Sequence, residues 1–479
     1  MKDKLRLEKT AQYAVLFLIG TIPLLFGAVH PAVTGAYTSL ILFSLGGWLL
    51  LNSRRVTGTK LFSVGPILFF ILIFCIGLST IPLPISWLEA LSPARASFLR
   101  SANQLAGVGI QFAPLGYNTH AAVLTASLLI ALSLYALTLK ILLKADRSFL
   151  KKLLLTCASV GMLEAIYGIL QATNLHLGVL WLTDMKQAKG MANGTIIYKN
   201  QYAALLNMIW PLTVGAALLY FKAVPRKKRP SSKKGRRTTT AEYMANQRLR
   251  GFVLLFIASI IMLAVLFTQS RGGILSMIFI LSILLIVLPV SSKSKLLLTG
   301  FFILFTVSYG SMIGFHSVLD RFMLIHQSGE IRLNIWMSSL PMLRDHLLLG
   351  TGIGSYIFLS SIYLKQFPEN IAFDRAHNDY LEFAIEMGLP LALFFLCALI
   401  FLLYFHIKKI RPYSTMKLYR IRSSAVISLI SAAAIIGFIL HGIVDFGWRL
   451  PANLLYVTTL FTLLQHGTLY SSPLPMKKS

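Results

Sequence analysis

The chain has 479 residues, of which 56% are hydrophobic and 13% charged, and its mean hydropathy is +0.72. This composition excludes an ordinary soluble fold and indicates an integral membrane protein. The formal net charge of +29 would suggest nucleic-acid binding in a soluble protein, so its distribution along the chain decides its meaning. The three cysteines each lie inside an apolar run, which is typical of buried side chains and not of disulfides or thiolate metal sites.

Twelve apolar runs are long enough to cross a bilayer as helices. The first follows a basic N-terminus, MKDKLRLEK, without a convincing cleavage site, so we expect a membrane span and not a removed signal. The sequence therefore predicts an all-α polytopic membrane protein, a single domain over residues 1–479 with about 12 transmembrane helices. The predicted spans are 12–29, 33–51, 64–81, 120–139, 153–170, 203–221, 251–268, 273–290, 296–315, 388–405, 423–444 and 450–466.

Basic residues are concentrated in alternate connections between these spans. If the N-terminus is cytoplasmic, the inner segments carry 33 of the 45 Lys and Arg residues, and the rest of the chain has no net charge. This positive-inside pattern predicts that both termini and the basic loop at 222–250 lie in the cytoplasm. That loop could also grip nucleic acid or anionic headgroups, but its Pro, Ser, Gly and Lys favour a flexible loop that sets topology. We therefore predict membrane lipids as partners, and no nucleic acid.

The longest polar segment, residues 316–387, forms a large periplasmic loop between predicted helices 9 and 10. Most connections are only a few residues long, and longer ones tend to be functional, so we expect this loop to be catalytic. Arg321, Arg332 and Arg344 lie near its start, and Arg332 with Trp336 at i, i+4 predicts a helix along the membrane surface. A guanidinium fork matches phosphate oxygens, so converging arginines suit a phosphate-bearing substrate.

Three shorter outer segments add further polar or interfacial groups. The prolines and Trp of PLPISWLEALSP, at 82–93, predict an interfacial re-entrant piece. Lys199 follows GMANGTIIY at the outer mouth of the sixth span, where it either snorkels or has a function. Arg271 lies in TQSRGG, a turn whose Gly pair is expected to permit a tight backbone. Arg271 either contacts lipid phosphate or has a function, and the scarcity of other outer helix-end cations favours the second.

The end of the long loop has a stronger pattern. In AHNDYLEFAIEMGLP, at 376–390, His377 enters a helix whose Asn378, Glu382 and Glu386 follow along one face. A polar stripe running into a membrane helix is costly unless it is used. The alternative is an interfacial helix start that is capped by Asn or Asp.

Two further patterns lie on the same outer side. His441 and Asp445, with Arg449 beyond, form an i, i+4 pair that belongs either to the same site or to structural pairing. The run LLLGTGIGSY at 347–356 has the glycine spacing of phosphate-cradling loops, but the strand and cytosolic ligand pool of a dinucleotide site are both missing. The ten histidines include no HxxxH or HxH pair, so we predict neither a metal site nor a cofactor.

Five stretches together resemble the O-antigen ligase and polymerase superfamily of bacterial inner membranes. They are PLPISWLEALSP at 82–93, GTIIYKNQYA at 194–203, SRGG at 270–273, RLNIWMSSLPMLRDHLLLGTGIGSY at 332–356 and AHNDYLEFAIEMGLP at 376–390. The resemblance extends from about residue 64 to 450, and the last two stretches are the specific ones. It implies a glycosyltransferase of lipopolysaccharide or surface polysaccharide biosynthesis, which moves a glycan from undecaprenyl diphosphate to an acceptor outside the cytoplasm.

The resemblance also implies acceptors and site residues. In the superfamily, ligases use the lipid A core and polymerases use the end of another carrier-linked glycan, and both activities stay open at this point. The matching positions imply that His377 is catalytic and that Arg271, Arg332 and Lys199 bind the diphosphate. Relatives often carry an arginine or a His-Lys pair at the position of Lys199, where this chain departs from the pattern.

The chemistry of transfer agrees with these residues. A diphosphate is a good leaving group, so stabilising its charge matters more than a general acid, and arginines with a lysine supply that without a metal. The acceptor hydroxyl needs a base, for which we expect His377, with Asp379 or Glu382 orienting its ring. His441, oriented by Asp445, is the competing base. A single displacement at the anomeric carbon inverts its configuration.

A membrane transporter or lipid flippase is the alternative from a different class. Such a protein would carry ionisable groups near the bilayer midplane and broken helices in paired halves. Here Glu164 alone lies deep in a predicted span, and the other polar groups gather on one face. The sequence therefore favours the transferase.

Overall fold

The chain is a bundle of apolar helices. Its structure, a computed structural model, describes residues 2–53, 64–173, 177–180, 182, 190–223, 234–293, 295–296, 299–300, 303, 307, 325–368 and 373–469. Within these residues, seven helices are long and apolar enough to cross a membrane. The predicted all-α polytopic class is confirmed.

The long helices supply most of the bundle. The seven candidate spans are α2–η2–α3 (Pro31–Ile41, Leu42–Gly46, Gly47–Leu51), α8 (Thr119–Ala145), α9 (Phe149–Ala172), α10 (Lys199–Lys222), α11 (Lys234–Phe267, apolar from Glu242), α18 (Leu389–Ile410) continued by η4 (Arg411–Thr415), and α19 (Ser423–His441). The other helices of the bundle are α1 (Lys2–Thr21), α5 (Val64–Leu78), α12 (Arg271–Val287) and α20 (Pro451–Leu469), with the short turns η1 (Phe26–Ala28), η5 (Leu418–Arg420) and η6 (Gly447–Arg449).

Each predicted span but one overlaps one of these helices. The exception, at 296–315, falls largely outside the described residues, so the number of twelve spans stays a prediction. The basic loop predicted at 222–250 differs in its second half, because α11 already begins at Lys234. The reason is that good helix formers, namely Ala, Glu, Met, Gln, Leu and Arg, occupy eight of the ten residues 241–250. Residues 224–233 of that loop lie outside the described residues.

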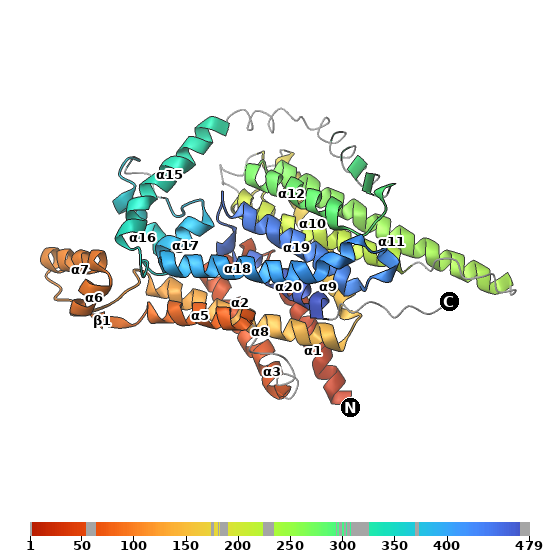
Figure 1. Cartoon of the computed structure of the whole chain (residues 1–479), viewed down its shortest axis with the longest axis horizontal. Coiled ribbons are helices and arrows are strands. Elements are labelled where there is room, and N and C mark those ends of the chain that lie inside the picture. Colours follow the sequence, from red (N-terminus) through yellow and green to blue (C-terminus); the bar gives the residue numbers. More distant parts are fainter. Residues whose placement is uncertain are drawn as a thin grey trace.

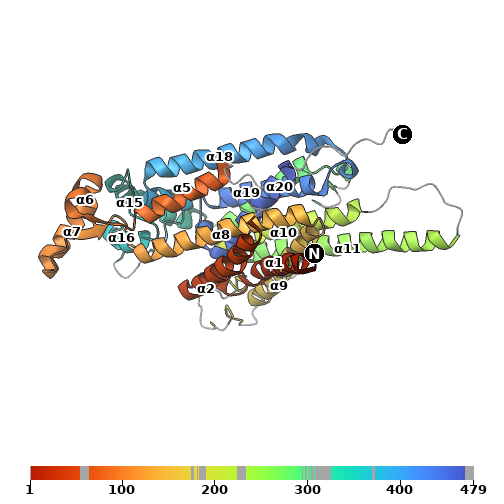
Figure 2. The ribbon, with the colours of Figure 1, turned by 90° about the horizontal axis from the view of Figure 1, so that it is seen from below.

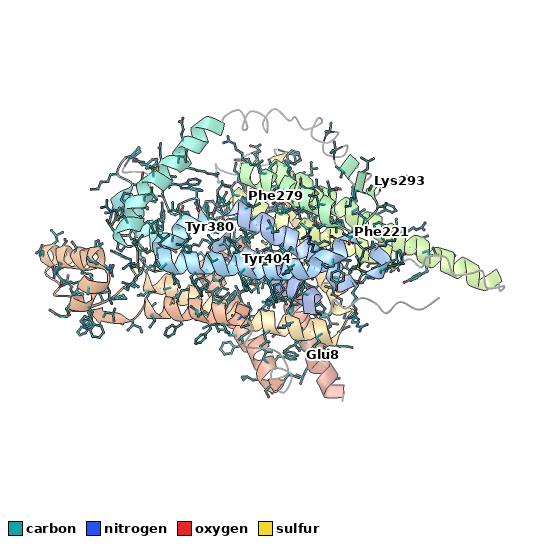
Figure 3. All side chains as sticks on the ribbon, viewed as in Figure 1. Glu8, Phe221, Phe279, Lys293, Tyr380 and Tyr404 are labelled. Atoms are coloured by element: carbon teal, nitrogen blue, oxygen red, sulfur yellow. The ribbon has the colours of Figure 1, made fainter. Side chains whose placement is uncertain are left out.

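The helices run roughly along the long axis of the molecule (Figures 1 and 2). Helix α10 lies at the centre, where it packs against α9, α11, α12, α19 and α20, and 83% of its apolar window is buried. In contrast, only 11% of the window of α18 is buried. Tyr404 of α18 and Phe279 of α12, which are labelled in Figure 3, are 62% and 44% exposed. Exposed apolar surface on helices of this length is what a lipid environment requires.

Shorter helices gather at one end of the bundle (Figure 1). Helices α15 (Ile325–Asp345), α16 (Tyr356–Tyr363) and α17 (Asp379–Met387) form what we call the cap. The predicted helix containing Arg332 and Trp336 is confirmed as α15, and Trp336 donates its indole N–H to the carbonyl of Ala376 at 3.0 Å. Arg321 and residues 369–372 of the predicted loop lie outside the described residues.

The segment predicted as a re-entrant piece is a small folded extension of this end. Strand β1 (Pro82–Pro84) pairs antiparallel with β2 (Phe112–Pro114), and α6 (Ile85–Leu91) and α7 (Pro93–Ala106) lie between them. Leu88, Ala96, Leu99 and Ala113 form a core of its own. The extension reaches beyond the end of α5 in both views (Figures 1 and 2).

Gly388 separates the cap from the bundle. Its φ of 81° lies in the left-handed region, and a Cβ there would collide with the backbone of Leu348. Glycine is therefore required, and the chain turns from α17 into α18 at this point. The amide of Leu389 also donates to the carbonyl of Leu347 at 2.8 Å. These contacts fix α17, and with it His377, at the N-terminal end of α18.

Candidate functional site

His377 lies at the start of α17. Asn378 caps this helix, because its side-chain oxygen accepts from the amides of Tyr380 and Leu381 at 3.0 Å each. His377 itself has a φ of 53°, which is strained for a residue with a side chain. Its ring packs edge-on against Phe446 with the centroids 5.0 Å apart, and among the described residues its buried Nδ1 has no hydrogen-bond partner. The capped helix start, expected as an alternative to a functional stripe, thus coexists with a histidine whose Nδ1 has no hydrogen-bond partner among the described residues.

The same aromatic ring joins His377 to the start of α10. The ring of Tyr198 packs edge-on against Phe446 at 5.3 Å, and its hydroxyl donates to Asp374 at 3.1 Å. Lys199 is the next residue and the first of α10, and its Nζ lies 3.1 Å from the sulfur of Met191. The structure thus brings the two sequence stretches that hold Lys199 and His377 together.

Asp445 lies between Arg332 and His441. Its Oδ2 is 3.9 Å from Nη2 of Arg332 and 3.8 Å from Nε2 of His441, both longer than hydrogen bonds. Burial raises the pKa of Asp445 to about 6, against the opposing charges of Arg332 and Lys199. Burial and the Arg332 guanidinium together hold the pKa of His377 below its ordinary value of 6.5. We call Lys199, Arg332, His377, His441 and Asp445 the open cluster.

The turn that carries Arg271 adjoins this cluster. The backbone turns at Gln269, with a φ of 52°, and the hydroxyl of Ser270 caps α12 by accepting from Gly273 at 3.2 Å. The expectation that the Gly pair makes the turn is therefore wrong. Gly272 and Gly273 lie inside the helix, where a Cβ on Gly272 would be 3.0 Å from the His441 ring. Glycine is needed for this close approach, which places Arg271 next to a residue in contact with His441.

The carboxylates of α17 are engaged by arginines. Glu382 Oε1 lies 3.0 Å from Arg375 Nη1 and 3.0 Å from Arg449 Nη2, and its Oε2 accepts from the amide of Ala376 at 3.0 Å. Arg449 also pairs with Glu386. We call Arg375, Glu382, Glu386 and Arg449 the closed network. Since both oxygens of Glu382 have these partners, Glu382 holds the backbone before His377 and does not contact its ring.

Asp379, the other residue expected to orient His377, faces a different neighbour. Its carboxylate accepts from the amide of Trp448 at 3.3 Å. Its own amide donates to the carbonyls of Gly442 at 2.9 Å and Asp445 at 3.0 Å. Burial raises the pKa of Asp379. Asp379 therefore ties the start of α17 to the end of α19, which places His377 beside the His441 and Asp445 pair.

The glycine-rich run encloses an anion that belongs to the chain. Gly350, Gly352 and Gly354 all have positive φ values, of 72°, 85° and 77°. The amide of Gly354 donates to the carboxylate of Glu386 at 2.9 Å, and that of Gly352 donates to its backbone carbonyl at 2.8 Å. A Cβ on Gly350 would collide with the same backbone. The loop thus cradles Glu386, which explains its phosphate-loop spacing without a phosphate.

Sequence reasoning missed several residues of this region. Arg375 and Tyr198 lie beside residues that were singled out, so their adjacency was a usable signal. The sequence marks Arg449 only by its place beyond Asp445, and no pattern marks Phe446. Their roles arise from contacts across the chain, for which no local pattern exists.

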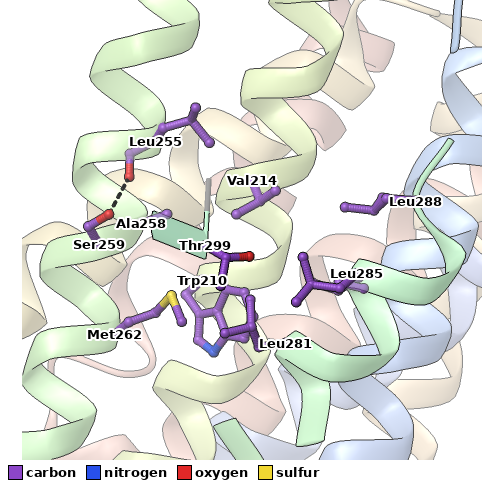
Figure 4. A pocket seen from close by; sticks show the side chains of 11 residues that line it. Trp210, Val214, Leu255, Ala258, Ser259, Met262, Leu281, Leu285, Leu288 and Thr299 are labelled. Carbon is purple, nitrogen blue, oxygen red and sulfur yellow. Dashed lines mark hydrogen bonds between the residues drawn. The ribbon is translucent and has the colours of Figure 1, made fainter. Parts of the chain in front are cut away.

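A separate cavity of about 60 Å³ lies among α10, α11 and α12 (Figure 4). Trp210, Met262 and Leu281 are among its apolar lining residues. Its few hydroxyls include that of Ser259, which already donates to the carbonyl of Leu255 at 3.1 Å. A cavity of this size and character suits a small hydrocarbon group and not a glycan or a diphosphate.

A metal ion is the remaining candidate ligand of the site. Among the residues that the structure describes, no three His, Cys, Asp or Glu gather in a way that could hold a metal ion. Metal-independent transfer stays a prediction. The arrangement offers cations for an anionic group, a neutral histidine, and a buried carboxylate beside a second histidine.

Comparison with known proteins adds one match. Residues 253–396 match the model of the O-antigen ligase family. This segment contains Arg271, Arg332 and His377, whereas Lys199 and the His441 and Asp445 pair lie outside it. No curated protein matches the chain.

Proposed function

On the match of residues 253–396 to the O-antigen ligase family, we propose that the protein is a glycosyltransferase that moves a glycan from undecaprenyl diphosphate to a hydroxyl of the lipid A core. It would act in the bacterial inner membrane, in lipopolysaccharide or surface polysaccharide biosynthesis. Both termini would lie in the cytoplasm, and the open cluster would face the periplasm. The superfamily implies a lipid-linked donor and a glycan acceptor in general, and we propose undecaprenyl diphosphate as the lipid and the lipid A core as the acceptor.

One observation carries the proposal: His377 is half-buried, its buried Nδ1 has no hydrogen-bond partner among the described residues, and it lies beside cations. Burial and Arg332 together lower the pKa of His377. Arg332 also lies 3.9 Å from Asp445, and Lys199 opposes the rise that burial causes in the pKa of Asp445. A base must be neutral before it can accept a proton, and a cation beside it keeps it neutral near pH 7. The same cation suits the phosphate oxygens of the donor.

The residues then divide into two roles. His377 accepts the proton of the acceptor hydroxyl as that oxygen attacks the anomeric carbon. Arg271 and Arg332, with Lys199, bind the diphosphate and stabilise its charge as it leaves. Attack and departure occur on opposite faces of the anomeric carbon, so its configuration inverts. No step of this scheme needs a metal.

The membrane orientation is tested by reporter fusions. A fusion near residue 235 should report the cytoplasm, because the inner segments carry 33 of the 45 basic residues. Fusions within 346–368 should report the periplasm. Periplasmic activity from the first fusion would overturn the orientation and would place the open cluster on the cytoplasmic side of the membrane.

The function is tested by deletion followed by gel analysis of surface glycans. A ligase deletion should remove glycan from the lipid A core while carrier-linked chains accumulate. Persistence of single capped units on the core would instead mean a polymerase, the alternative within the superfamily. An unchanged glycan profile, together with no transfer by the purified protein, would contradict the proposal.

A further inference from the structure

Glu164 is a fully buried carboxyl group within the membrane helix α9, and the proposed reaction does not use it. Among the described residues, no cation pairs with it. Among these residues, two titratable groups face it. The hydroxyl of Tyr202 in α10 donates to the backbone carbonyl of Glu164 at 2.7 Å, and Tyr456 lies in α20. Ionising a carboxyl group in such a place, without a paired cation, costs on the order of several kcal/mol.

The contacts of Thr195 allow the hydrogen atoms to be counted. Its hydroxyl oxygen lies 2.8 Å from the carbonyl oxygen of Pro23 and 2.6 Å from Oε1 of Glu164. Both are hydrogen-bond distances, but a threonine hydroxyl has only one hydrogen to donate. The carbonyl of Pro23 can only accept. If the Thr195 hydroxyl donates its hydrogen to the carbonyl of Pro23, the hydrogen of the contact with Glu164 must come from the Glu164 carboxyl group.

We infer that Glu164 is an uncharged carboxylic acid that donates to Thr195 and so positions Lys199 at the site. Its other oxygen, Oε2, accepts from the amide of Thr195 at 2.9 Å, which uses the remaining acceptor. Thus one neutral acid satisfies both the backbone and the side chain of Thr195. The role of Lys199 in this inference rests on the proposed function, whereas the protonation of Glu164 does not.

Glu164 is part of a set of contacts that fix the segment before α10. Gln171, two turns further along α9, donates to the carbonyl of Gly194 at 2.9 Å and accepts from the amide of Asn193 at 3.0 Å. Gly194 has a φ of 58°, and a Cβ there would collide with Glu164 and Tyr202. The segment is therefore bound along one side by α9, and it leads directly to Tyr198 and Lys199.

The same segment is bound on its other side by the turn that carries Arg271. The amide of Ala192 donates to the carbonyl of Phe267 at 2.9 Å, and the side chain of Gln269 donates to the carbonyl of Gly190 at 3.1 Å. Loss of the Glu164 contacts would therefore shift Lys199 relative to Arg271. Misplacement of a catalytic group by about 1 Å can cost about 100-fold in rate.

The protonation is tested by infrared difference spectroscopy on the purified protein near neutral pH. The spectrum of wild type minus Glu164→Gln should contain the C=O stretching band of a neutral carboxylic acid. Carboxylate stretching bands in its place would overturn the inference. This result does not depend on transfer activity, so a failure of the proposed function leaves it intact and the two failures are distinguishable.

The positioning role is tested by a series of variants assayed for transfer. In Glu164→Gln the amide N–H replaces the acid O–H, so turnover should stay within about 3-fold of wild type. Glu164→Leu should lower kcat about 10–100-fold with a smaller change in KM, because a misplaced cation no longer stabilises the charge of the departing diphosphate. Leu163→Ala, at the neighbouring position with 58% exposure, is the matched control and should change neither.

Two outcomes would overturn the role. If Glu164→Gln is as inactive as Glu164→Leu while both fold, the negative charge is required. If Glu164→Leu keeps wild-type kcat, the acid does not position the site. Should Glu164→Leu fail to insert, Thr195→Val removes only the hydroxyl and tests the same contact, with the same expected fall in kcat.

Discussion

The open cluster and the closed network both adjoin the short helix α17, and both combine buried carboxylates with basic side chains. In the closed network, Glu382 meets two arginines at 3.0 Å each and a backbone amide at 3.0 Å. In the open cluster, Asp445 meets Arg332 and His441 at 3.9 and 3.8 Å, and the ring nitrogens of His441 and Nδ1 of His377 have no hydrogen-bond partner among the described residues. The carboxylates of the first set are satisfied within the protein, whereas the second set keeps these unpartnered ring nitrogens.

This difference separates structural charge from functional charge. A buried charge with a full set of partners holds segments together, and removing one partner leaves an uncompensated ion. A buried polar group without partners has an energetic cost that needs an explanation, and where such groups gather beside cations, as in the open cluster, we assign them to a binding site. The comparison predicts that variants of the closed network lose stability, while variants of the open cluster lose transfer.

The largest effect is expected for His377→Ala. Loss of a general base typically costs on the order of 10²–10⁴ in rate, while a ring without hydrogen bonds at Nδ1 contributes little to folding. Transfer by the purified protein and its thermal unfolding midpoint should be measured together. His441→Ala, measured beside it, would move the base to α19 if it abolishes turnover while His377→Ala does not.

The next largest effect is expected for Arg449→Ala. This change leaves Glu382 and Glu386, both with 0% exposure, without their shared cation. Breaking a buried pair costs about 3–5 kcal/mol, so the protein should unfold far more easily or fail to accumulate in the membrane. Arg420→Ala is the control, since Arg420 lies in the exposed turn η5. Wild-type stability in Arg449→Ala would show that the network is not structural.

A smaller effect is expected for Arg271→Lys. The charge is kept, but the planar fork that binds two phosphate oxygens is lost. Since a hydrogen bond to a charged group contributes about 1.5–3 kcal/mol, turnover should fall about 10–100-fold with normal insertion. Transfer that survives Arg271→Ala and depends on added divalent metal would contradict the role assigned to Arg271.

The smallest effect is a displacement of the acidic limb of the pH profile. Burial and Arg332 lower the pKa of His377 from 6.5, so the ring stays neutral below the pH at which a free histidine becomes protonated. Transfer should therefore keep its plateau through pH 6.5 and fall only under more acidic conditions. Replacing Arg332 by Gln should move this limb upward, towards 6.5, in rate measurements on the residual activity. An unchanged limb would mean that another group limits the rate.

The sequence was most informative where the signal was local. Apolar length predicted the helices, eleven of whose twelve ranges overlap a described helix, and the Arg332 and Trp336 spacing predicted α15. The stretch after His377 predicted a helix, and the Asn cap that the structure contains there was the alternative to a functional polar face. The sequence wrongly assigned the Gly272 and Gly273 pair to the turn, because two glycines fit a turn and a close helix contact equally well. Which role applies depends on His441, 169 positions away in the sequence.

The division between the two sets of charges could not be predicted from the sequence. Glu382 looked like a partner for His377 because both lie in one short stretch, but Arg449 reaches it from another segment at 3.0 Å. A carboxylate pairs with whichever cation the tertiary fold brings closest, and periodicity along the chain contains no record of that. The same holds for Glu164, whose partner Thr195 is 31 residues away.

The most direct test of the division is a paired measurement on His377→Gln and Glu382→Gln in the purified protein, with turnover and unfolding midpoint determined for each. The account predicts that His377→Gln loses turnover by about 100-fold or more and keeps the wild-type midpoint. It predicts that Glu382→Gln lowers the midpoint and changes turnover less, because an uncharged amide does not compensate Arg375 and Arg449 and its NH2 group cannot accept from the amide of Ala376. The reverse pattern, a stable and inactive Glu382→Gln beside an unstable and active His377→Gln, would contradict it.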